Sequence, residues 1–313
     1  MDDLERLMIT DFGQLKVSTR TYLLVSNIKV NLSFMFDNFA VDEDVVLPKR
    51  RRRKIEAPAT EYPPSGTIVG AKFGWKIRGI DVKRRSKVAK NKSFRNSVSI
   101  SMVCVDKILN LKFCSNGSIQ CTGCRTDEQL DTAVRELWDI NRRLGCYEFS
   151  RGDFYEVLYV PVMRNVDFKI GFNVDREKLL NLIEGNPVYK DKMIVSNYMY
   201  TDVNIKIKID RNIEDIQITK MRFKDGEWER QTTTYREYLS LLSERDREAK
   251  LSKEYYVTFM VFHSGTIILT AINEEYAREA FYYFLGFLNE NKHNIREMIS
   301  EADDVPSSDC ADL

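Results

Sequence analysis

Residues 113–124 read FCSNGSIQCTGC and contain a strong turn signal. Asn116-Gly117 is typical of a two-residue hairpin turn, because both turn positions need positive φ. The flanking segments, 107–113 and 118–122, are strand-like. This stretch therefore predicts a β-hairpin, and its three cysteines raise the question of a metal or redox site.

A helix is predicted directly after the hairpin. Thr126 and Gln129 have the spacing of a capping box, and Gly145 is typical of a helix C-terminus. Apolar residues at helical spacing lie between them: Leu130, Ala133, Val134, Leu137 and Leu144. The predicted unit is therefore strand, turn, strand, helix.

A second copy of this unit begins in residues 262–272, FHSGTIILTAI. Ser264-Gly265 marks its turn, and Asn273 is a cap for a helix predicted to run to about residue 295. The hairpin glycines, Gly117 and Gly265, are 148 residues apart. An internal repeat of this kind says more about architecture than any single motif.

Other segments complete the two halves. Residues 18–36 are β-rich, and from Asn27 onward polar and apolar side chains alternate, which predicts a half-buried strand. Residues 67–80 have room for one short strand. The remaining predictions are strands at 97–102, 156–172 and 203–209, a short helix at 175–184, and a charged, partly helical stretch at 211–253.

The composition excludes several classes of protein. The chain has 313 residues, 43% hydrophobic and 30% charged, which suffices for one large or two small cores. It has no run of 18 apolar residues, so no membrane-spanning helix is expected, and its acidic N-terminus lacks the apolar core of a signal peptide. Six cysteines are too few for a disulfide framework, which favours a reducing, intracellular compartment. Only two histidines are available for catalysis or zinc binding.

The net charge of +1 conceals a basic segment. Residues 49–95 contain sixteen Lys and Arg against three acids, whereas residues 297–313 contain six acids and no base. A basic segment in a near-neutral chain fits an anionic partner such as nucleic acid, and a solvated loop is the alternative. The KRRRRK run at 49–54 also fits a nuclear-import signal.

The repeated unit resembles the TATA-box-binding protein (TBP) family, in which each half has a strand, a short helix, further strands and a long helix. Two hairpin–helix passages carry the likeness, FCSNGSIQCTGCRTDEQLDTAVREL at 113–137 and VTFMVFHSGTIILTAINEEYAREAF at 257–281. LLVSNIKVNLSF at 23–34 and NKSFRNSVSI at 91–100 add to it. GSIQCTGC, preceded by a basic stretch, is most similar to the divergent TBP-like proteins of large double-stranded DNA viruses.

The resemblance implies an α+β saddle, in which two pseudo-symmetric repeats share a curved antiparallel sheet with helices on its convex face. The N-terminal repeat would span 1–150 with a basic insertion at about 41–92. The C-terminal repeat would span 151–296 with a charged insertion at about 210–253, before an acidic tail at 297–313.

The resemblance also implies a function, because the family's concave sheet lies in the minor groove of double-stranded DNA and bends it. We therefore expect a transcription initiation factor whose protein partners are other initiation factors or an RNA polymerase. Its place would be a host nucleus or a cytoplasmic viral factory. No cofactor, metal, membrane or small-molecule substrate is expected.

In this family, aromatic wedges at both ends of the saddle push between base steps. The matching positions are Phe94, Phe113, Tyr200 and Phe262. Tyr198 is an alternative to Tyr200. Phe113 stands four residues before Gly117, whereas the family has three, so Cys114 takes the position if the turn does not absorb the extra residue.

Threonine and asparagine read the minor groove from the floor of the family's saddle. Thr122 and Thr270 match the threonines, and Asn27 matches the asparagine of the first half. Either Asn165 or Met163 matches that of the second half. The groove's acceptor pattern separates A·T from G·C poorly.

Other positions matched to the floor are more polar here. Gln120 and Lys29 stand where the family has branched apolar residues, whereas Ile268 keeps the pattern. Arg125 and Lys206 match basic residues that contact phosphate. A polar floor favours backbone and water contacts over dry packing on base edges, which predicts weak selectivity for TATA sequences.

Three other interpretations are set against DNA binding. Zinc or redox chemistry at Cys121 and Cys124 lacks further ligands, and a regular strand would point these side chains to opposite faces, so buried reduced cysteines are favoured. No P-loop, G-x-S-x-G or H-E-x-x-H motif is present, so an enzyme is not predicted. The alternative function is a protein-interaction platform that keeps the saddle fold without bending DNA, with helices beginning at Asp127 and Glu274 as its surfaces.

Overall fold

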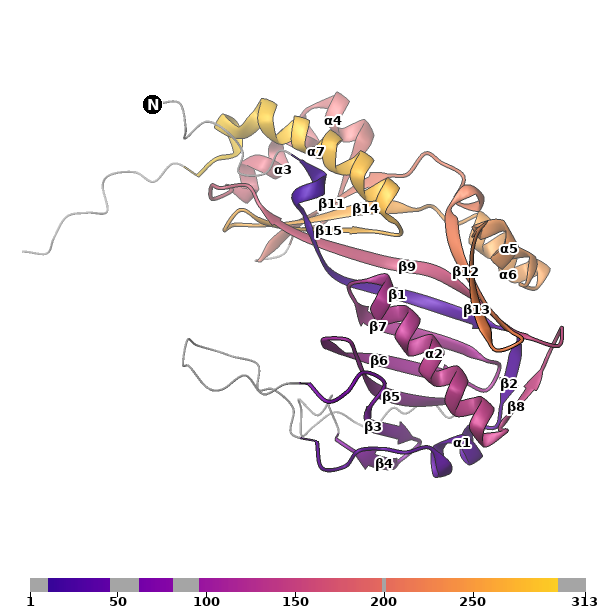
Figure 1. Cartoon of the computed structure of the whole chain (residues 1–313). Coiled ribbons are helices and arrows are strands. Elements are labelled where there is room, and N and C mark those ends of the chain that lie inside the picture. The colour runs from indigo at the N-terminus through magenta and orange to yellow at the C-terminus, as the bar shows by residue number, and fades with distance from the viewer. Residues whose placement is uncertain (1–10, 46–61, 81–95, 199–200, 298–313) are drawn as a thin grey trace, which may run out of the picture.

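The computed structural model describes residues 11–45, 62–80, 96–198 and 201–297. Strands from both halves of the chain join in one curved antiparallel sheet, which is an open C in the view of Figure 1. The predicted α+β saddle built from two repeats is confirmed.

The first repeat contributes the lower part of the sheet in Figure 1. Its elements are β1 (Lys16–Ser26), α1 (Leu32–Asn38), β3 (Ile68–Phe73), β4 (Lys76–Gly79), β5 (Ser97–Cys104), β6 (Lys107–Cys114), β7 (Ser118–Cys124) and α2 (Asp127–Leu144). A short 3-10 turn, η1 (Phe12–Gln14), precedes them. β2 (Ile28–Val30) and β8 (Tyr147–Phe149) form a separate two-stranded sheet.

The second repeat follows the same order. Its elements are β9 (Tyr155–Lys169), α3 (Arg176–Gly185), α4 (Pro187–Lys192), β10 (Met193–Tyr198), β11 (Asp202–Lys208), β14 (Tyr256–Phe262), β15 (Thr266–Ala271) and α7 (Glu274–Ile295). An insertion after β11 contains η2 (Ile213–Asp215), β12 (Gln217–Lys224), β13 (Glu227–Thr234), α5 (Tyr235–Ser240) and α6 (Glu244–Leu251).

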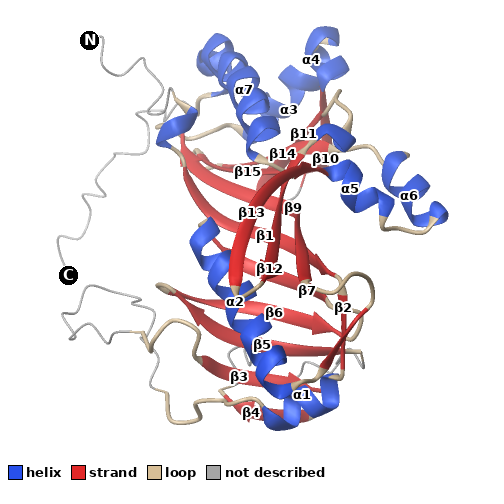
Figure 2. Ribbon diagram, turned by 45° about the vertical axis from the view of Figure 1, so that its right-hand side comes forward, coloured by secondary structure: helices blue, strands red, loops and turns tan. Residues whose placement is uncertain are grey.

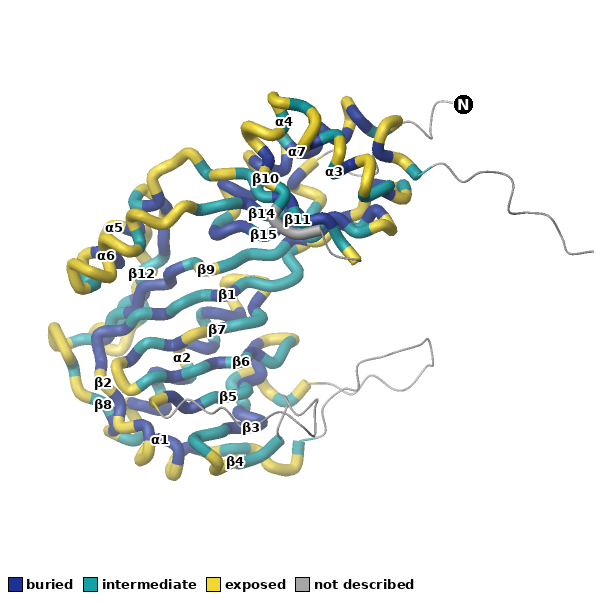
Figure 3. The backbone as a smooth tube through the Cα atoms, turned by 180° about the vertical axis from the view of Figure 1, so that it is seen from behind, coloured by how far each residue is buried: buried dark blue, intermediate teal, exposed yellow. Residues whose placement is uncertain are grey.

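The long helices lie on one side of the sheet, whose strand order is β10-β11-β14-β15-β9-β1-β7-β6-β5-β3-β4. The two repeats meet where β1 pairs with β9. α2 packs on β5 and β7, and α7 packs on β14 and β15 (Figure 2). Each helix covers its own apolar cluster. Along the strands, buried residues alternate with partly exposed ones (Figure 3).

The hairpin turns of the two repeats have equivalent hydrogen bonds. Gly117 N–H donates to the carbonyl of Cys114 and Gly265 N–H donates to that of Phe262, both at 3.0 Å. Both glycines have positive φ, and a Cβ on either would lie 2.1 Å from a neighbouring carbonyl oxygen. The close approach of the backbone therefore requires glycine in both turns.

The two long helices also begin in the same way. Thr126 and Gln129 form the predicted capping box at α2, and the Asn273 side chain accepts from Tyr276 N–H at α7. Arg20 and Arg164 lie opposite each other in β1 and β9. Each forms an ion pair with the first residue of the nearer long helix, Arg20 with Asp127 at 2.7 Å and Arg164 with Glu274 at 2.8 Å.

The prediction of a strand through residues 27–36 is wrong beyond β2. Asn31 accepts a hydrogen bond from Phe34 N–H at 3.1 Å and so caps α1. The buried residues that follow, Leu32, Met35, Phe36 and Phe39, have helical rather than alternating spacing. In the sequence, the apolar residues of 32–36 fit the period of a strand as well as that of a helix, and the Asn31 cap favours the helix.

Two other segments contain more strand than expected. Residues 67–80 form a hairpin, β3 and β4, rather than one strand, and β3 extends the main sheet beside β5. The charged stretch at 211–253 is partly helical as predicted, but it also contains the β12–β13 hairpin. β12 pairs with the N-terminal part of β9, so the sheet forks there.

Candidate nucleic-acid interface

The face of the sheet opposite the helices is identified from strand register, since directly paired residues share a face. Ile119 and Cys121 are buried beneath α2, so Gln120 and Thr122 point to the other face. In β15, Ile267 and Leu269 are buried, whereas Ile268 and Thr270 are partly exposed. This second face, called the concave face below, carries most of the predicted contact residues.

Two rows of directly paired residues cross the concave face near its centre. The first row is Ser101, Asn110, Thr122, Thr21 and Met163, and the second is Lys206, Thr258, Thr270, Asn165 and Thr19. The rows run over equivalent strands in the two repeats. We call them together the concave floor.

The central positions of the floor carry hydroxyl or amide side chains in both repeats. Thr270 Oγ1 donates to Asn165 Oδ1 at 3.0 Å, and Thr122 Oγ1 donates to the Asn110 carbonyl at 3.2 Å. Thr21 is the repeat counterpart of Asn165 and is buried. Sequence reasoning included Thr122, Thr270 and Asn165 but missed Asn110 and the threonines of β1 and β14, which the period-2 alternation of those strands could have indicated.

The two ends of the concave face differ in polarity. In the first repeat, Lys112 and Gln120 lie next to the floor, whereas their counterparts in the second repeat are Met260 and Ile268. Lysine predominates among the charged residues of the paired strands on this face, which include Lys16, Lys72, Lys112, Lys169, Lys206, Lys208, Asp167 and Asp202. Such a surface suits an anionic partner.

The register answers which residue takes the first-repeat wedge position. Phe113 is only 1% exposed and packs in the cluster beneath α2. Cys114, not Phe113, occupies the position equivalent to Phe262, as the two turn hydrogen bonds show. The turn does not absorb the extra residue, so a thiol stands where the second repeat has an aromatic ring on the concave face.

Asn27 and Lys29 lie away from the concave floor. Asn27 is 1% exposed, and its amide hydrogen bonds to the carbonyls of Arg151 and Phe154 and to Glu156 N–H. It fixes the turn out of β1 and leaves no side-chain atom for a ligand. Lys29 lies in β2, outside the main sheet. Asn165 and Met163, the two alternatives for the second half, both lie on the floor, in the second and first row respectively.

The predicted basic contacts are both accessible. Arg125, in the loop before α2, is exposed, and its Nε donates to the Ser18 carbonyl at 3.4 Å. Lys206 ends the second row of the floor, with its Nζ 5.9 Å from the Tyr256 ring centroid. Phe94, Tyr200 and the basic run at 49–54 lie outside the described residues, as does the side chain of Tyr198.

The C-x-x-C pair is buried, but the two cysteines share one face, contrary to the alternation argument. Gly123, which has positive φ, is the extra residue of β7 at the register shift opposite Arg20 and Thr21, and it turns Cys124 to the same side as Cys121. The hydrogen bond between the two thiols and burial raise the pKa of Cys121, and burial raises the pKa of Cys104 to about 12. Within the described residues, no group of three or more His, Cys, Asp or Glu is placed to bind a metal.

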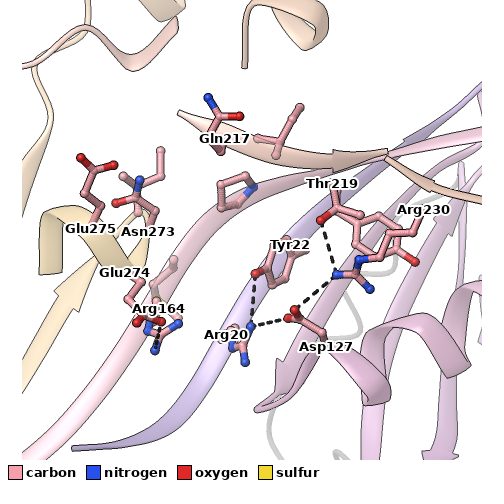
Figure 4. A pocket seen from close by; sticks show the side chains of 15 residues that line it. Arg20, Tyr22, Asp127, Arg164, Gln217, Thr219, Arg230, Asn273, Glu274 and Glu275 are labelled. Carbon is pink, nitrogen blue, oxygen red and sulfur yellow. Dashed lines mark hydrogen bonds and ion pairs between the residues drawn. The ribbon is translucent and has the colours of Figure 1, made fainter. Parts of the chain in front are cut away.

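A polar pocket of about 270 Å³ lies between the N-termini of the two long helices (Figure 4). Three guanidinium groups line it, from Arg20, Arg164 and Arg230. Arg230 pairs with Asp127 and Asp131, at 3.3 and 2.6 Å, and the other two pair with the helix ends described above. Each cation has an acidic partner, so the pocket is a polar junction between the repeats and the insertion.

The insertion covers part of the concave side. Leu158 and Val160 point to the same face as Leu23, away from α2, yet each is only 2% exposed. They belong to the apolar cluster that includes Ile218 and Tyr238 of the insertion. The insertion therefore covers the concave side at the N-terminal part of β9 and leaves the concave floor, which crosses β9 at Met163 and Asn165, accessible.

The chain has viral relatives. An uncharacterized protein, 335L, of invertebrate iridescent virus 6 is 24% identical over 295 residues, which cover 90% of this chain and 86% of that protein. The TATA-box-binding protein-like protein of Acanthamoeba polyphaga mimivirus is 29% identical over 141 residues, 37% of each chain. One relative bears the name of the family that the sequence resembles, so the resemblance to TBP-like viral proteins is confirmed.

The chain is also similar to solved structures. Among solved structures, the TBP of Methanococcus jannaschii aligns with a TM-score of 0.45 and 10% identity, over 88% of this chain and 98% of that one. No family model matches the chain. None of the described helices is long and apolar enough to cross a membrane.

Proposed function

We propose that this protein is a TBP-like transcription initiation factor that binds the minor groove of double-stranded DNA with its concave face. The concave floor is the observation that carries the proposal. Its two rows place hydroxyl and amide groups at positions related by the internal repeat, and duplex DNA presents backbones related by a similar two-fold symmetry. The amide N–H groups of Asn110 and Asn165 can donate hydrogen bonds to the acceptors of A·T pairs in the minor groove, whereas the Thr122 and Thr270 hydroxyls, whose protons bond within the floor, can accept.

Bending of the DNA duplex would depend on the second repeat of the saddle. Phe262 lies on the concave face at the end of β14, paired with Asp202, where it could enter between base steps. Unstacking costs a few kcal/mol per step, which the extra contact surface of a bent duplex offsets. At the equivalent first-repeat position, Cys114 is too small to act as a wedge.

The polar first repeat supports weak selectivity for TATA sequences. Lys112 and Gln120 cannot pack on A·T edges as branched apolar side chains do. They favour contacts to phosphate and water, which carry little sequence information. Ile268 and Met260 supply apolar contact in the second repeat alone.

The protein partners that we propose are other initiation factors or an RNA polymerase, in a host nucleus or a viral factory. α2 and α7 present their outer surfaces to such partners on the convex side, opposite the DNA. No bond-making step is part of this function.

A protein-interaction platform is the second candidate. Two observations favour it, the thiol at the first-repeat wedge position and the insertion that buries Leu158 and Val160. In this function, the saddle would hold partners without bending DNA.

Energy transfer between dyes on the two ends of a duplex separates the two candidates. The wild type should bring the ends closer, whereas Phe262→Ala should bind with less bending. Competition with TATA, scrambled A/T and G/C duplexes should give less than about a hundredfold preference, below the 10³–10⁷ ratios of specific DNA-binding proteins. A larger TATA preference would contradict weak selectivity, and a wild type that neither binds nor bends duplex would favour the platform.

A further inference from the structure

The most exposed large apolar side chain among the described residues lies outside the positions discussed so far. Trp75 is 90% exposed in the turn between β3 and β4. The other two tryptophans contribute to the core: Trp138 is 3% exposed and stacks on Tyr155 at 4.3 Å, and Trp228 packs against the same cluster. Within the part of the chain that the structure describes, the Trp75 indole contributes little to packing, which makes it available for a contact with a partner.

Strand register places this tip at the first-repeat end of the sheet. Phe73, just before the turn, pairs with Val98, which in turn pairs with Phe113 next to Cys114. The tip of the β3–β4 hairpin and the wedge position therefore end the sheet on the same side. Phe73 and Phe113 are two strand spacings apart, roughly 10 Å.

The surroundings of Trp75 are basic. Lys72 lies on the concave face of the same hairpin, and Lys112 lies two strands away on that face. Lys76 and Arg78 flank the tip on the helix side, where Arg78 lies over the Phe36 and Phe39 rings. One nearby acid, Asp37, pairs with Lys76 at 3.4 Å. Ile77, 47% exposed, pairs with Lys72 and so also faces the concave side. An aromatic group among cations is the combination that stacks on bases beside a phosphate backbone.

We propose that the β3–β4 hairpin is an additional contact for duplex DNA, and that Trp75 supplies the aromatic group that Cys114 lacks at the first-repeat end. This inference rests on the proposed binding of DNA by the concave face. It accounts for the asymmetry of the saddle, because among the described residues an aromatic side chain then stands at each end, Phe262 in one repeat and Trp75 in the other. The two groups come from different strands, so the ends would deform DNA differently.

The test uses the full chain and two readouts, anisotropy of a dye-labelled A/T-rich duplex and tryptophan emission on titration with unlabelled duplex. Duplex should quench the wild-type emission because Trp75 is the exposed fluorophore. Trp75→Phe should bind within a few-fold of the wild type without that quenching. Trp75→Ala should bind about tenfold more weakly, because the lost stacking on a base is partly offset by the duplex unstacking that is then avoided. Val188→Ala, at an exposed apolar residue on α4, should change nothing.

The outcomes separate this inference from the function beneath it. A wild type that binds duplex with unchanged emission, together with full affinity of Trp75→Ala, would overturn the role of Trp75 and leave DNA binding intact; Trp75 would then serve a protein partner. A wild type that fails to shift the anisotropy would overturn both. Thermal unfolding of each variant checks that the fold is retained.

Discussion

At the scale of single residues, one additional residue in the first hairpin turn changes the chemistry of one end of the saddle. Phe113 turns inward to the core, and Cys114 takes the outer position that Phe262 occupies in the second repeat. Sequence reasoning located the ambiguity but could not resolve it, because the tight turn at Gly117 is compatible with either residue. The register of β6 with β5 and β7 resolves it.

This assignment predicts opposite effects for two phenylalanines. Phe113→Ala should lower the free energy of unfolding by about 3–5 kcal/mol, because it leaves a cavity beneath α2. Phe262→Ala should cost less than half of that, since its ring is partly exposed, while reducing DNA bending. Urea unfolding of the two variants checks the first effect. Equal destabilisation would contradict the placement of Phe113.

Asn27 shows why a residue match can mislead. Its position in an alternating run fits a floor asparagine, but the carbonyls of Arg151 and Phe154 receive both amide protons. Those partners are more than 120 residues away in sequence, so no local pattern could have revealed them. Asn165, whose role depended on the choice of alignment, lies on the floor instead.

At the scale of elements, local signals predicted where the two long helices begin, because caps are formed by residues three apart. The capping box of α2 and the asparagine cap of α7 were both readable from the sequence. The strand–helix choice at residues 32–38 was not, since its short apolar run fits either period. The β12–β13 hairpin was missed because β13 exposes mostly charged and polar side chains and carries no alternating apolar signal.

The cap of α3 gives a stability prediction with a defined pH dependence. Asp175 Oδ1 accepts from Lys178 N–H at 3.1 Å, and this hydrogen bond lowers the pKa of Asp175. Asp175→Ala should therefore lower the free energy of unfolding by about 1 kcal/mol at pH 7. The unfolded chain has the higher pKa, near 3.9, so the contribution is complete above about pH 4 and is lost as pH falls through the lowered folded value.

Urea unfolding at pH 7 and pH 3 tests this prediction. Asp175→Asn keeps an uncharged cap, so it should lose less stability than the wild type over this interval. The Asp175→Ala deficit should shrink at pH 3. A deficit that is the same at both pH values would show that the carboxylate does not stabilise the helix end.

At the scale of the whole molecule, the internal repeat made the fold predictable. Two hairpins that each lead into a capped helix were enough to indicate a pseudo-symmetric sheet. The repeat also has limits as a guide. The spacing between equivalent residues is 144 in the central strands, as for Arg20 and Arg164, but 148 in the hairpins, so a single alignment offset misplaces one set or the other. The sequence therefore indicates that the two repeats differ, and strand register shows which residues are equivalent.

The most direct test of the central claim is duplex binding by a variant with both floor threonines changed to glutamate. Thr122→Glu with Thr270→Glu places two negative charges on the concave floor, and Gln231→Glu with Asn289→Glu, at exposed positions on β13 and α7, adds the same charge elsewhere. Anisotropy with a labelled duplex should show binding weakened about a hundredfold or more for the floor pair, because like charges then oppose the phosphates. The control pair should bind nearly as the wild type does. Equal affinities for the two pairs would contradict the concave face as the DNA-binding surface.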